Sequence, residues 1–431
     1  MATSVARPTV PPPVQTKVQS PVQSTHQQTE RTFFCATMTG SLAMVACALA
    51  ILGLLLPFPD AAQRHSPYPV DITVGPLPQA IAVNGQIRLA YELHLTNFAP
   101  WPVEVTAIDV LGDGAKPLAS FDRDALNNRV VPVEKVLLSL EPDPTGKSRT
   151  LDAGHSVIIF IDVTLDRGAA APAQLHHRFS FSNAGDDGAP VARTIDVATI
   201  PVVQEPTPVL RAPLRGSGWI AFNALSAYEH RRAFNPVDGR LRIAQRFAID
   251  WGRIGPDGRM FRGDGKSNTD YYNYGAEVVA VADARVSDIK DSLPDNTGAS
   301  ERSDRKVTLD NAVGNDVILD LGHGKFAVYA HLQPGSLKVK VGDKVKAGQP
   351  LALLGNSGNS DAPHLHFQVV DASSPLGAEG LPYEIESFTV LGVLDNASVL
   401  DTGNPWKPKP QEKPIVHRAE FPGDNSVVSF P

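Results

Sequence analysis

The chain of 431 residues carries a formal net charge of -7 at pH 7 and has a sequence pI of about 5.9. Nucleic-acid binding requires clustered basic residues that neutralise phosphates, so this acidic balance argues against a nucleic-acid partner. Both cysteines, Cys35 and Cys47, lie in one apolar segment, which leaves the rest of the chain without a disulfide. Packed hydrophobic cores must therefore stabilise it.

The N-terminal part of the chain predicts a tail and a membrane anchor. Residues 1–32 are rich in Pro, Gln, Ser, Thr and Val and cannot bury enough apolar surface to fold, so we expect a disordered cytoplasmic tail. Residues 33–58 are almost uninterrupted apolar sequence without a charge, long enough for a transmembrane helix. Basic residues outnumber acidic ones before it, which places everything from about Asp60 onward outside the cytoplasm. We expect an uncleaved signal anchor, with a cleaved signal peptide as the alternative.

The next region, residues 69–203, predicts a β-domain. Apolar and polar residues alternate over 87–95 and 103–108, and 157–163 is an apolar run. Short strands separated by Pro, Gly and Asn favour an antiparallel β-sandwich of immunoglobulin type. No catalytic constellation is visible there, so we expect a spacer or a contact surface. The Pro-rich residues 204–215 predict a stiff linker.

Two histidines, His364 and His366, form the most informative pair in the chain. Alternate residues of a strand face the same side, so both imidazoles can address one site. The pair follows the turn-rich residues 355–363, and residues 339–350 upstream read as strand, tight turn and strand. A third histidine, His331, is therefore expected on a neighbouring strand.

Residues 274–370 carry three motifs in a fixed order. These are a Tyr-x-His-Leu strand, a Val-x-Val-Gly-Asp-x-Val turn and a Gly-Asn-Ser-Gly segment that leads to His-Leu-His-Phe. In this order they resemble the lysostaphin-type (LytM) zinc endopeptidases. The resemblance implies a mostly β chain, with an antiparallel β-sheet peptidase domain at 216–392. It also implies a bacterial envelope, so the anchor would lie in the inner membrane, as a single pass with periplasmic domains.

The resemblance also implies the site. In that family, zinc is held by a His and an Asp four residues apart on one strand and by the second His of the His-x-His pair. Asp250 and His366 would then bind the metal, while His331 and His364 would act in catalysis. Zinc prefers nitrogen and oxygen ligands, and a catalytic site keeps one position open. The residue four positions before Asp250 is Arg246, which has no lone pair to offer a metal.

Three interpretations of this substitution stay open. In the first, Arg246 pairs with Asp250 and the site is degenerate. In the second, His230 supplies the missing ligand. In the third, Gln245 or an extra water completes a weaker site around Asp250 and His366. If Arg246 occupies a ligand position, exchanging it for histidine should strengthen zinc binding.

Two functions of different class follow. As an enzyme, the chain would be a membrane-anchored zinc endopeptidase that cleaves the peptide cross-links of peptidoglycan. Alternatively, a catalytically degenerate module would bind cell-wall peptide or regulate a separate wall hydrolase. Peptidoglycan peptides, the membrane and another wall hydrolase are thus the expected partners. The Pro-rich residues 393–431 are expected to form an extended C-terminal tail.

Overall fold

The computed structural model describes residues 68–133, 147–185, 187–225, 230–297, 307–397, 400 and 403–431. The predicted tail at 1–32 and the predicted anchor at 33–58 lie outside these ranges. Within them, no helix has both the length and the apolar character needed to cross a membrane.

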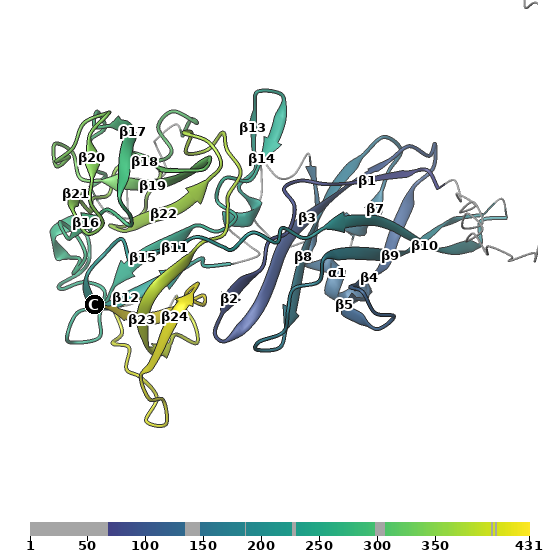
Figure 1. Ribbon diagram of the computed structural model, residues 1–431. Coiled ribbons are helices and arrows are strands. Elements are labelled where there is room, and N and C mark those ends of the chain that lie inside the picture. Colours follow the sequence, from purple (N-terminus) through teal and green to yellow (C-terminus); the bar gives the residue numbers. More distant parts are fainter. Residues whose placement is uncertain are drawn as a thin grey trace, which may run out of the picture. The chain divides into compact units, whose positions relative to one another are not determined.

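The N-terminal part of the described chain consists of two antiparallel sheets, here called the two-sheet domain (Figure 1). One sheet has the order β1-β3-β8-β6 with β2 beside β3, and the other has the order β10-β9-β4-β5 with β7 beside β4. The strands of the first sheet are β1 (Val70–Val74), β2 (Ile81–Val83), β3 (Gln86–Asn97), β6 (Val130–Pro132) and β8 (Ser156–Leu165). Those of the second are β4 (Val103–Leu111), β5 (Pro117–Phe121), β7 (Thr150–Leu151), β9 (Gln174–Ala184) and β10 (Pro190–Pro201). Helix α1 (Arg123–Asn127) and the 3-10 turn η1 (Lys147–Arg149) connect them.

Alternating side chains place one face of each sheet in a shared core. In β4, Val103 and Val105 face this core, and a β-bulge between Val105 and Ala107 shifts the register. Ile108 and Val110 therefore continue the buried face although their spacing from Val103 is odd. The strands expected in this region are present, whereas the immunoglobulin-type topology stays a prediction.

A large sheet organises the C-terminal part of the chain (Figure 1). Over the described residues it has eleven strands, in the order β11-β23-β25-β12-β15-β22-β19-β18-β17-β20, with β24 beside β23. Its strands are β11 (Val209–Leu210), β12 (Gly216–Phe222), β15 (Ile249–Arg253), β17 (Ala284–Lys290), β18 (Asn315–Gly322), β19 (Lys325–Leu332), β20 (Lys344–Val345), β22 (Leu365–Val370), β23 (Glu384–Val393), β24 (Ile415–Glu420) and β25 (Ser426–Phe430). Two small pairs, β13 (Asn235–Val237) with β14 (Arg240–Arg242) and β16 (Glu277–Val279) with β21 (Pro350–Leu353), and the turns η2 (His230–Arg232) and η3 (Asn268–Asp270) complete the described elements.

The middle of the large sheet positions the predicted site. Strand β22 is buried along its length and lies between β15 and β19. Tyr329 of β19 packs edge-on against Phe367 of β22 with ring centroids 5.1 Å apart, and Phe367 packs against Tyr383 at 5.2 Å. Large aromatic side chains on one face thus fix these strands, which leaves the opposite face of β22 to the histidines.

Two expectations on domain boundaries require correction. Residues 393–431 are not simply an extended tail, because β25 inserts between β12 and β23 and buries Val427 and Val428. No proline lies between Pro422 and Pro431, so every residue of β25 can donate its N–H to a neighbouring strand. The linker at 204–215 also joins the sheet, because β11 pairs in parallel with β23.

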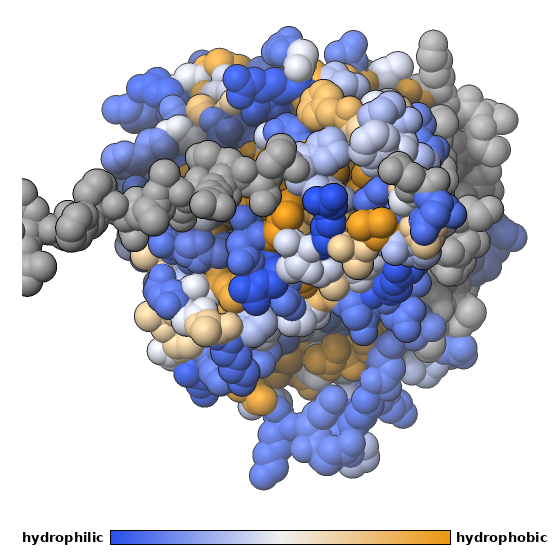
Figure 2. Space-filling view, turned by 90° about the vertical axis from the view of Figure 1, so that its right-hand side faces the viewer, coloured by the Kyte–Doolittle hydropathy of each residue, from blue (hydrophilic) through white to orange (hydrophobic). Residues whose placement is uncertain are grey.

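Figure 2 shows one side of the molecule, coloured by hydropathy. Hydrophilic residues dominate this face, and hydrophobic ones lie between them in small groups. Single apolar side chains exposed in this way are normal on a folded surface.

We expect Asp316 of β18 to make folding pH-dependent. It is 4% exposed, and burial, aided by the nearby Asp288, raises the pKa of Asp316 to about 7. The folded chain therefore keeps this proton when the unfolded chain has lost it, so stability should fall as pH rises from about 4 to about 7. Asp316→Asn should raise the free energy of unfolding at pH 8 by about 1–3 kcal/mol and change it less at pH 4. Urea unfolding at both pH values tests this.

The control for that experiment is Asp320→Asn on the same strand, where the side chain is only half-buried. A gain at pH 8 that is equally large at pH 4 would show that the charge of Asp316 is not its cause.

Candidate metal and catalytic site

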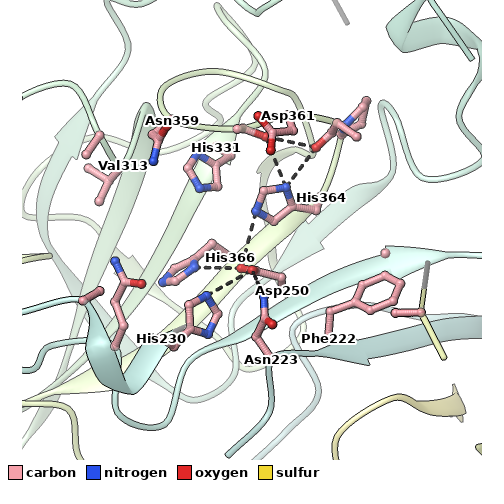
Figure 3. A pocket seen from close by; sticks show the side chains of 18 of the residues that line it. Phe222, Asn223, His230, Asp250, Val313, His331, Asn359, Asp361, His364 and His366 are labelled. Atoms are coloured by element: carbon pink, nitrogen blue, oxygen red, sulfur yellow. Dashed lines mark hydrogen bonds and ion pairs between the residues drawn. The ribbon is translucent and has the colours of Figure 1, made fainter. Parts of the chain in front are cut away.

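Three side chains converge at the centre of the large sheet. Ligand atoms of His230, Asp250 and His366 all lie within 4.8 Å of one another (Figure 3). Asp250 of β15 pairs directly with His366 of β22, which places their side chains on the same face. The Nδ1 atom of His366 lies 2.8 Å from Oδ1 of Asp250, and Nε2 of His230 lies 3.0 Å from Oδ2.

Hydrogen bonds behind the two imidazoles indicate their tautomers. Nε2 of His366 lies 2.8 Å from Oε1 of Gln368, whose amide nitrogen donates to the carbonyl of Pro375 at 2.6 Å. Since the Gln368 oxygen can only accept, His366 donates from Nε2, and in the neutral imidazole the lone pair is then on Nδ1. In the same way, Nδ1 of His230 donates to the carbonyl of Ala248 at 3.2 Å, which leaves the lone pair on Nε2.

In their neutral forms, both imidazoles therefore direct a lone pair at the carboxylate of Asp250, and in their protonated forms they direct a donor at it. Burial alone would raise the pKa of Asp250, but His230 and His364 beside it lower the pKa well below its usual range. Two imidazole nitrogens and a carboxylate oxygen, each oriented by a further hydrogen bond, are the donor set of a catalytic zinc site. Acceptors this close repel one another unless a cation or protons lie between them. The residues present thus fit zinc.

His331 and His364 lie beside this donor set. Nδ1 of His331 donates to the carbonyl of Ser357 at 2.7 Å, and Nδ1 of His364 lies 2.9 Å from the carbonyl of Ala362. The two rings have centroids 4.6 Å apart, and Nε2 of His364 lies 3.4 Å from Asp250. Burial, together with the neighbouring histidines, holds the pKa of His331 well below its usual range. Burial opposes protonation of His364 as well, but the carboxylate of Asp250 outweighs it and raises that pKa.

The backbone at His331 is held in an uncommon conformation. Its φ angle is 60°, in the left-handed region that few residues other than glycine adopt. Two hydrogen bonds hold it there: its N–H donates to Val313 at 2.9 Å and its carbonyl accepts from Gly355 at 3.1 Å. Such a conformation persists only where the surroundings determine it, and it is a common feature of functional sites.

Arg246 lies elsewhere than the family spacing implied. Its Nε donates to Glu92 of the two-sheet domain at 2.8 Å, its Nη2 to Glu379 at 3.1 Å and its Nη1 to the carbonyl of Gly380 at 2.9 Å. Arg246 does not pair with Asp250, so the degenerate pairing does not describe this site. The third residue of the donor set is His230.

The expectation that Arg246→His would strengthen zinc binding therefore loses its basis. The side chain at 246 is 3% exposed and satisfies two buried carboxylates, so its replacement would leave Glu92 and Glu379 short of a partner. Gln245, the other candidate ligand, lines the same pocket.

Sequence reasoning missed three residues of this arrangement. Gln368 lies two positions after His366 on the same strand face, a signal that the sequence does contain. Asn223, whose amide donates to Oδ2 of Asp250 at 3.0 Å, and Glu92 are distant in the sequence and have no such signal.

The donor set opens into a pocket of about 560 Å³. Its lining combines the histidines with apolar and polar side chains from several loops, among them Phe222, Met260 and Asp361. A concave site with few convergent polar groups and strongly shifted pKa values is the usual form of a catalytic pocket.

Comparison with known proteins identifies the domain. Residues 269–377 match the model of peptidase family M23, a range that contains His331, His364 and His366. The chain contains an M23 peptidase domain. The match begins after Asp250, so the positions of His230 and Asp250 come from the structure alone.

Curated relatives resemble part of this M23 domain. The chain is 37% identical over 81 residues to the murein hydrolase activator EnvC of Escherichia coli (strain K12), which is 17% of this chain and 19% of that protein. It is 37% identical over 65 residues to the peptidoglycan DD-endopeptidase ShyA of Vibrio cholerae (serotype O1, strain ATCC 39315 / El Tor Inaba N16961), 15% of each chain. The matches thus span less than a fifth of these relatives.

Solved structures show similar matches. The catalytic domain of lysostaphin from Staphylococcus simulans is 23% identical, with 38% of this chain and 86% of that chain covered and a TM-score of 0.20. A zinc-containing peptidase from Vibrio cholerae is 18% identical, with 68% and 82% covered and a TM-score of 0.22. At these scores, the family assignment rests on the sequence match.

The purified full-length chain should contain about one zinc ion per molecule, and both His230→Ala and His366→Ala should lose it. Each variant removes one of three protein donors, and metal affinity falls steeply when a ligand is lost. Elemental analysis after dialysis measures the content. His323→Asn, in the exposed turn after β18, is the matched control because asparagine tolerates the positive φ of 54° there. Zinc retained by His230→Ala would exclude His230 as a ligand.

Proposed function

We propose that this protein is a zinc-dependent endopeptidase of the bacterial envelope that cleaves the peptide cross-links of peptidoglycan. The observation that carries the proposal is the complete donor set: lone pairs of His230 and His366 and the carboxylate of Asp250 are directed at one another. His331 and His364 line the same pocket. A zinc ion held by the three donors would act as a Lewis acid on the scissile carbonyl.

The chain's own residues supply the proton transfers. Nδ1 of both His331 and His364 is hydrogen-bonded to a backbone carbonyl, which fixes each ring and leaves its Nε2 to exchange a proton. A neutral imidazole at His331 can take a proton from an attacking water, and an imidazolium at His364 can give one to the leaving amine. The buried backbone contacts of His331 keep its ring in place between these events.

The choice of substrate is supported by the relatives. The name of ShyA states a peptidoglycan endopeptidase, and the name of EnvC states an activator of murein hydrolases. A pocket of about 560 Å³ lies within the range of sites that take small ligands or short peptide segments. We extend the peptidoglycan substrate to this chain because its donor set and histidines suit amide hydrolysis.

The proposal includes the location. The uncharged apolar residues 33–58 are long enough to anchor the chain in the inner membrane, with the M23 domain in the periplasm. An anchored hydrolase would act on wall close to the membrane.

A second candidate is a regulator of a separate wall hydrolase. The observation that favours it is the match to EnvC, which is named as an activator rather than as a peptidase. Such a module would bind wall peptide in the same pocket without cleaving it.

Chelation separates the two candidates. Incubation of the full-length protein with peptidoglycan should release new amino termini, and removal of divalent metal should abolish this release until zinc is restored. Chromatography of the soluble fragments measures the cleavage. Sedimentation with peptidoglycan without any cleavage, whether zinc is present or not, would favour the regulator.

The variant His331→Ala should lower kcat about 10²–10⁴-fold, because it removes a proton acceptor from the pocket, while zinc content stays near that of the native chain. Cleavage of a defined cross-linked peptide, followed together with elemental analysis, tests both parts. His323→Asn again serves as the histidine control and should leave kcat unchanged. A loss of zinc in His331→Ala would show that this histidine binds the metal instead.

A further inference from the structure

The turn that bears His230 is attached to the two-sheet domain. Arg231 follows His230 in η2, and its side chain is fully buried. Its Nη2 donates to Oε1 of Glu92 at 2.9 Å, and its Nη1 donates to Oδ1 of Asp162 at 2.9 Å. Glu92 lies on β3 and Asp162 on β8, so both partners belong to the two-sheet domain.

Further contacts of this turn lead to the same domain. Nη2 of Arg231 also donates to the carbonyls of Tyr91 at 3.1 Å and Ile161 at 3.3 Å. Arg232 donates to the carbonyl of Asn128 at 2.6 Å and lies over the ring of Phe160. All of these residues lie in the two-sheet domain, and the turn of the metal ligand thus rests on it.

The carboxylate of Glu92 connects the turn that bears His230 with the segment that leads to Asp250. Oε1 of Glu92 accepts from Arg231, and Oε2 of Glu92 accepts from Arg246 at 2.8 Å. Arg246 lies four residues before Asp250, at the entry to β15. Glu92 therefore lies between the segment that carries His230 and the segment that carries Asp250.

The three ligands need this support to different extents. Asp250 and His366 are paired across adjacent strands of a hydrogen-bonded sheet, which sets their separation. His230 lies on a turn of three residues outside the sheet. A ligand on such a turn must be ordered when the metal binds, unless contacts elsewhere have already ordered it.

We propose that Glu92 of the two-sheet domain is a positioning residue for the metal site, because its bonds to Arg231 and Arg246 hold His230 against Asp250. The inference rests on the proposed zinc site. It gives the two-sheet domain a part in metal affinity beyond that of a spacer.

The burial of the cluster makes the proposal testable. Glu92 is 1% exposed, so a glutamine there would offer one acceptor oxygen and no charge to two buried guanidinium groups. Burial would raise the pKa of Glu92, but Arg246 and Arg231 outweigh it and lower the pKa, which keeps the carboxylate charged. Residues that orient metal ligands typically change metal affinity by 10- to 100-fold when altered.

The experiment compares Glu92→Gln with Glu104→Gln in the full-length chain. Glu104 also accepts from two arginines, Arg123 and Arg149, but all three lie within the two-sheet domain. Zinc affinity is measured by competition with a chromogenic chelator, and the absorption spectrum of the cobalt-substituted protein reports ligand geometry. We expect Glu92→Gln to weaken zinc binding about 10- to 100-fold and to alter the cobalt spectrum, whereas Glu104→Gln should change neither.

A second variant covers the case in which Glu92→Gln does not fold. Arg231→Lys keeps the buried positive charge but loses the forked contact with Glu92 and Asp162. It should also weaken zinc binding and alter the cobalt spectrum.

The outcomes are distinguishable. Native zinc affinity in every folded variant at position 92 or 231 would overturn the positioning role and leave the proposed function intact. An equal loss of affinity in Glu104→Gln would assign the effect to general destabilisation and would likewise overturn it. A native chain that binds no zinc would overturn both the positioning role and the proposed metal site.

Discussion

The buried carboxylate of Glu92, shared between Arg231 and Arg246, is the interaction on which the rest of this structure depends. A buried charge is stable only if its partners and hydrogen bonds are all present, because an unpaired ion in a protein interior costs several kcal/mol. The cluster thus connects the two-sheet domain with the chain segments that carry His230 and enter β15. Asp162 and Glu379 extend it on either side and complete the pairing of the arginines.

Two different physical constraints position the residues of the candidate metal site. Strand register fixes Asp250 opposite His366, and the hydrogen bond from His366 to Gln368 sets the tautomer. Ionic contacts outside the sheet hold the turn of His230. Backbone pairing between adjacent strands places Asp250 and His366 accurately. The ionic contacts of the neighbouring arginines position His230, which lies outside the sheet. Arginine at position 246 is therefore compatible with an intact donor set: it takes part in the ionic contacts that position His230, while strand pairing places Asp250 and His366.

Local sequence patterns predicted those parts of the site that local structure determines. His364 and His366 are two residues apart on the approach to one strand, and His331 follows a recognisable strand motif, so their convergence could be anticipated. The place of Arg246 could not, since its partner Glu92 lies 154 residues away and no periodicity relates them. For His230, the sequence offered a candidate, but only the packing of its turn distinguishes it from Gln245. Strand β25 was not predicted, because the proline-rich composition around it indicated an extended tail. The run Ser426–Phe430 is short, and it forms a strand by pairing with β12 and β23, which are distant in sequence or separated by a long loop.

The attachment of η2 to β3 and β8 has a consequence for how such a domain can be inherited. An exchange that joined the large sheet to a different N-terminal domain would transfer His331 of β19, His366 of β22 and His364 just before β22 intact. It would not transfer Glu92, which accepts from both Arg231 and Arg246, or Asp162, which also accepts from Arg231. The two domains would therefore have to be exchanged together for His230 to keep its contacts, and the range that matches the M23 family, residues 269–377, leaves out two of the three donors.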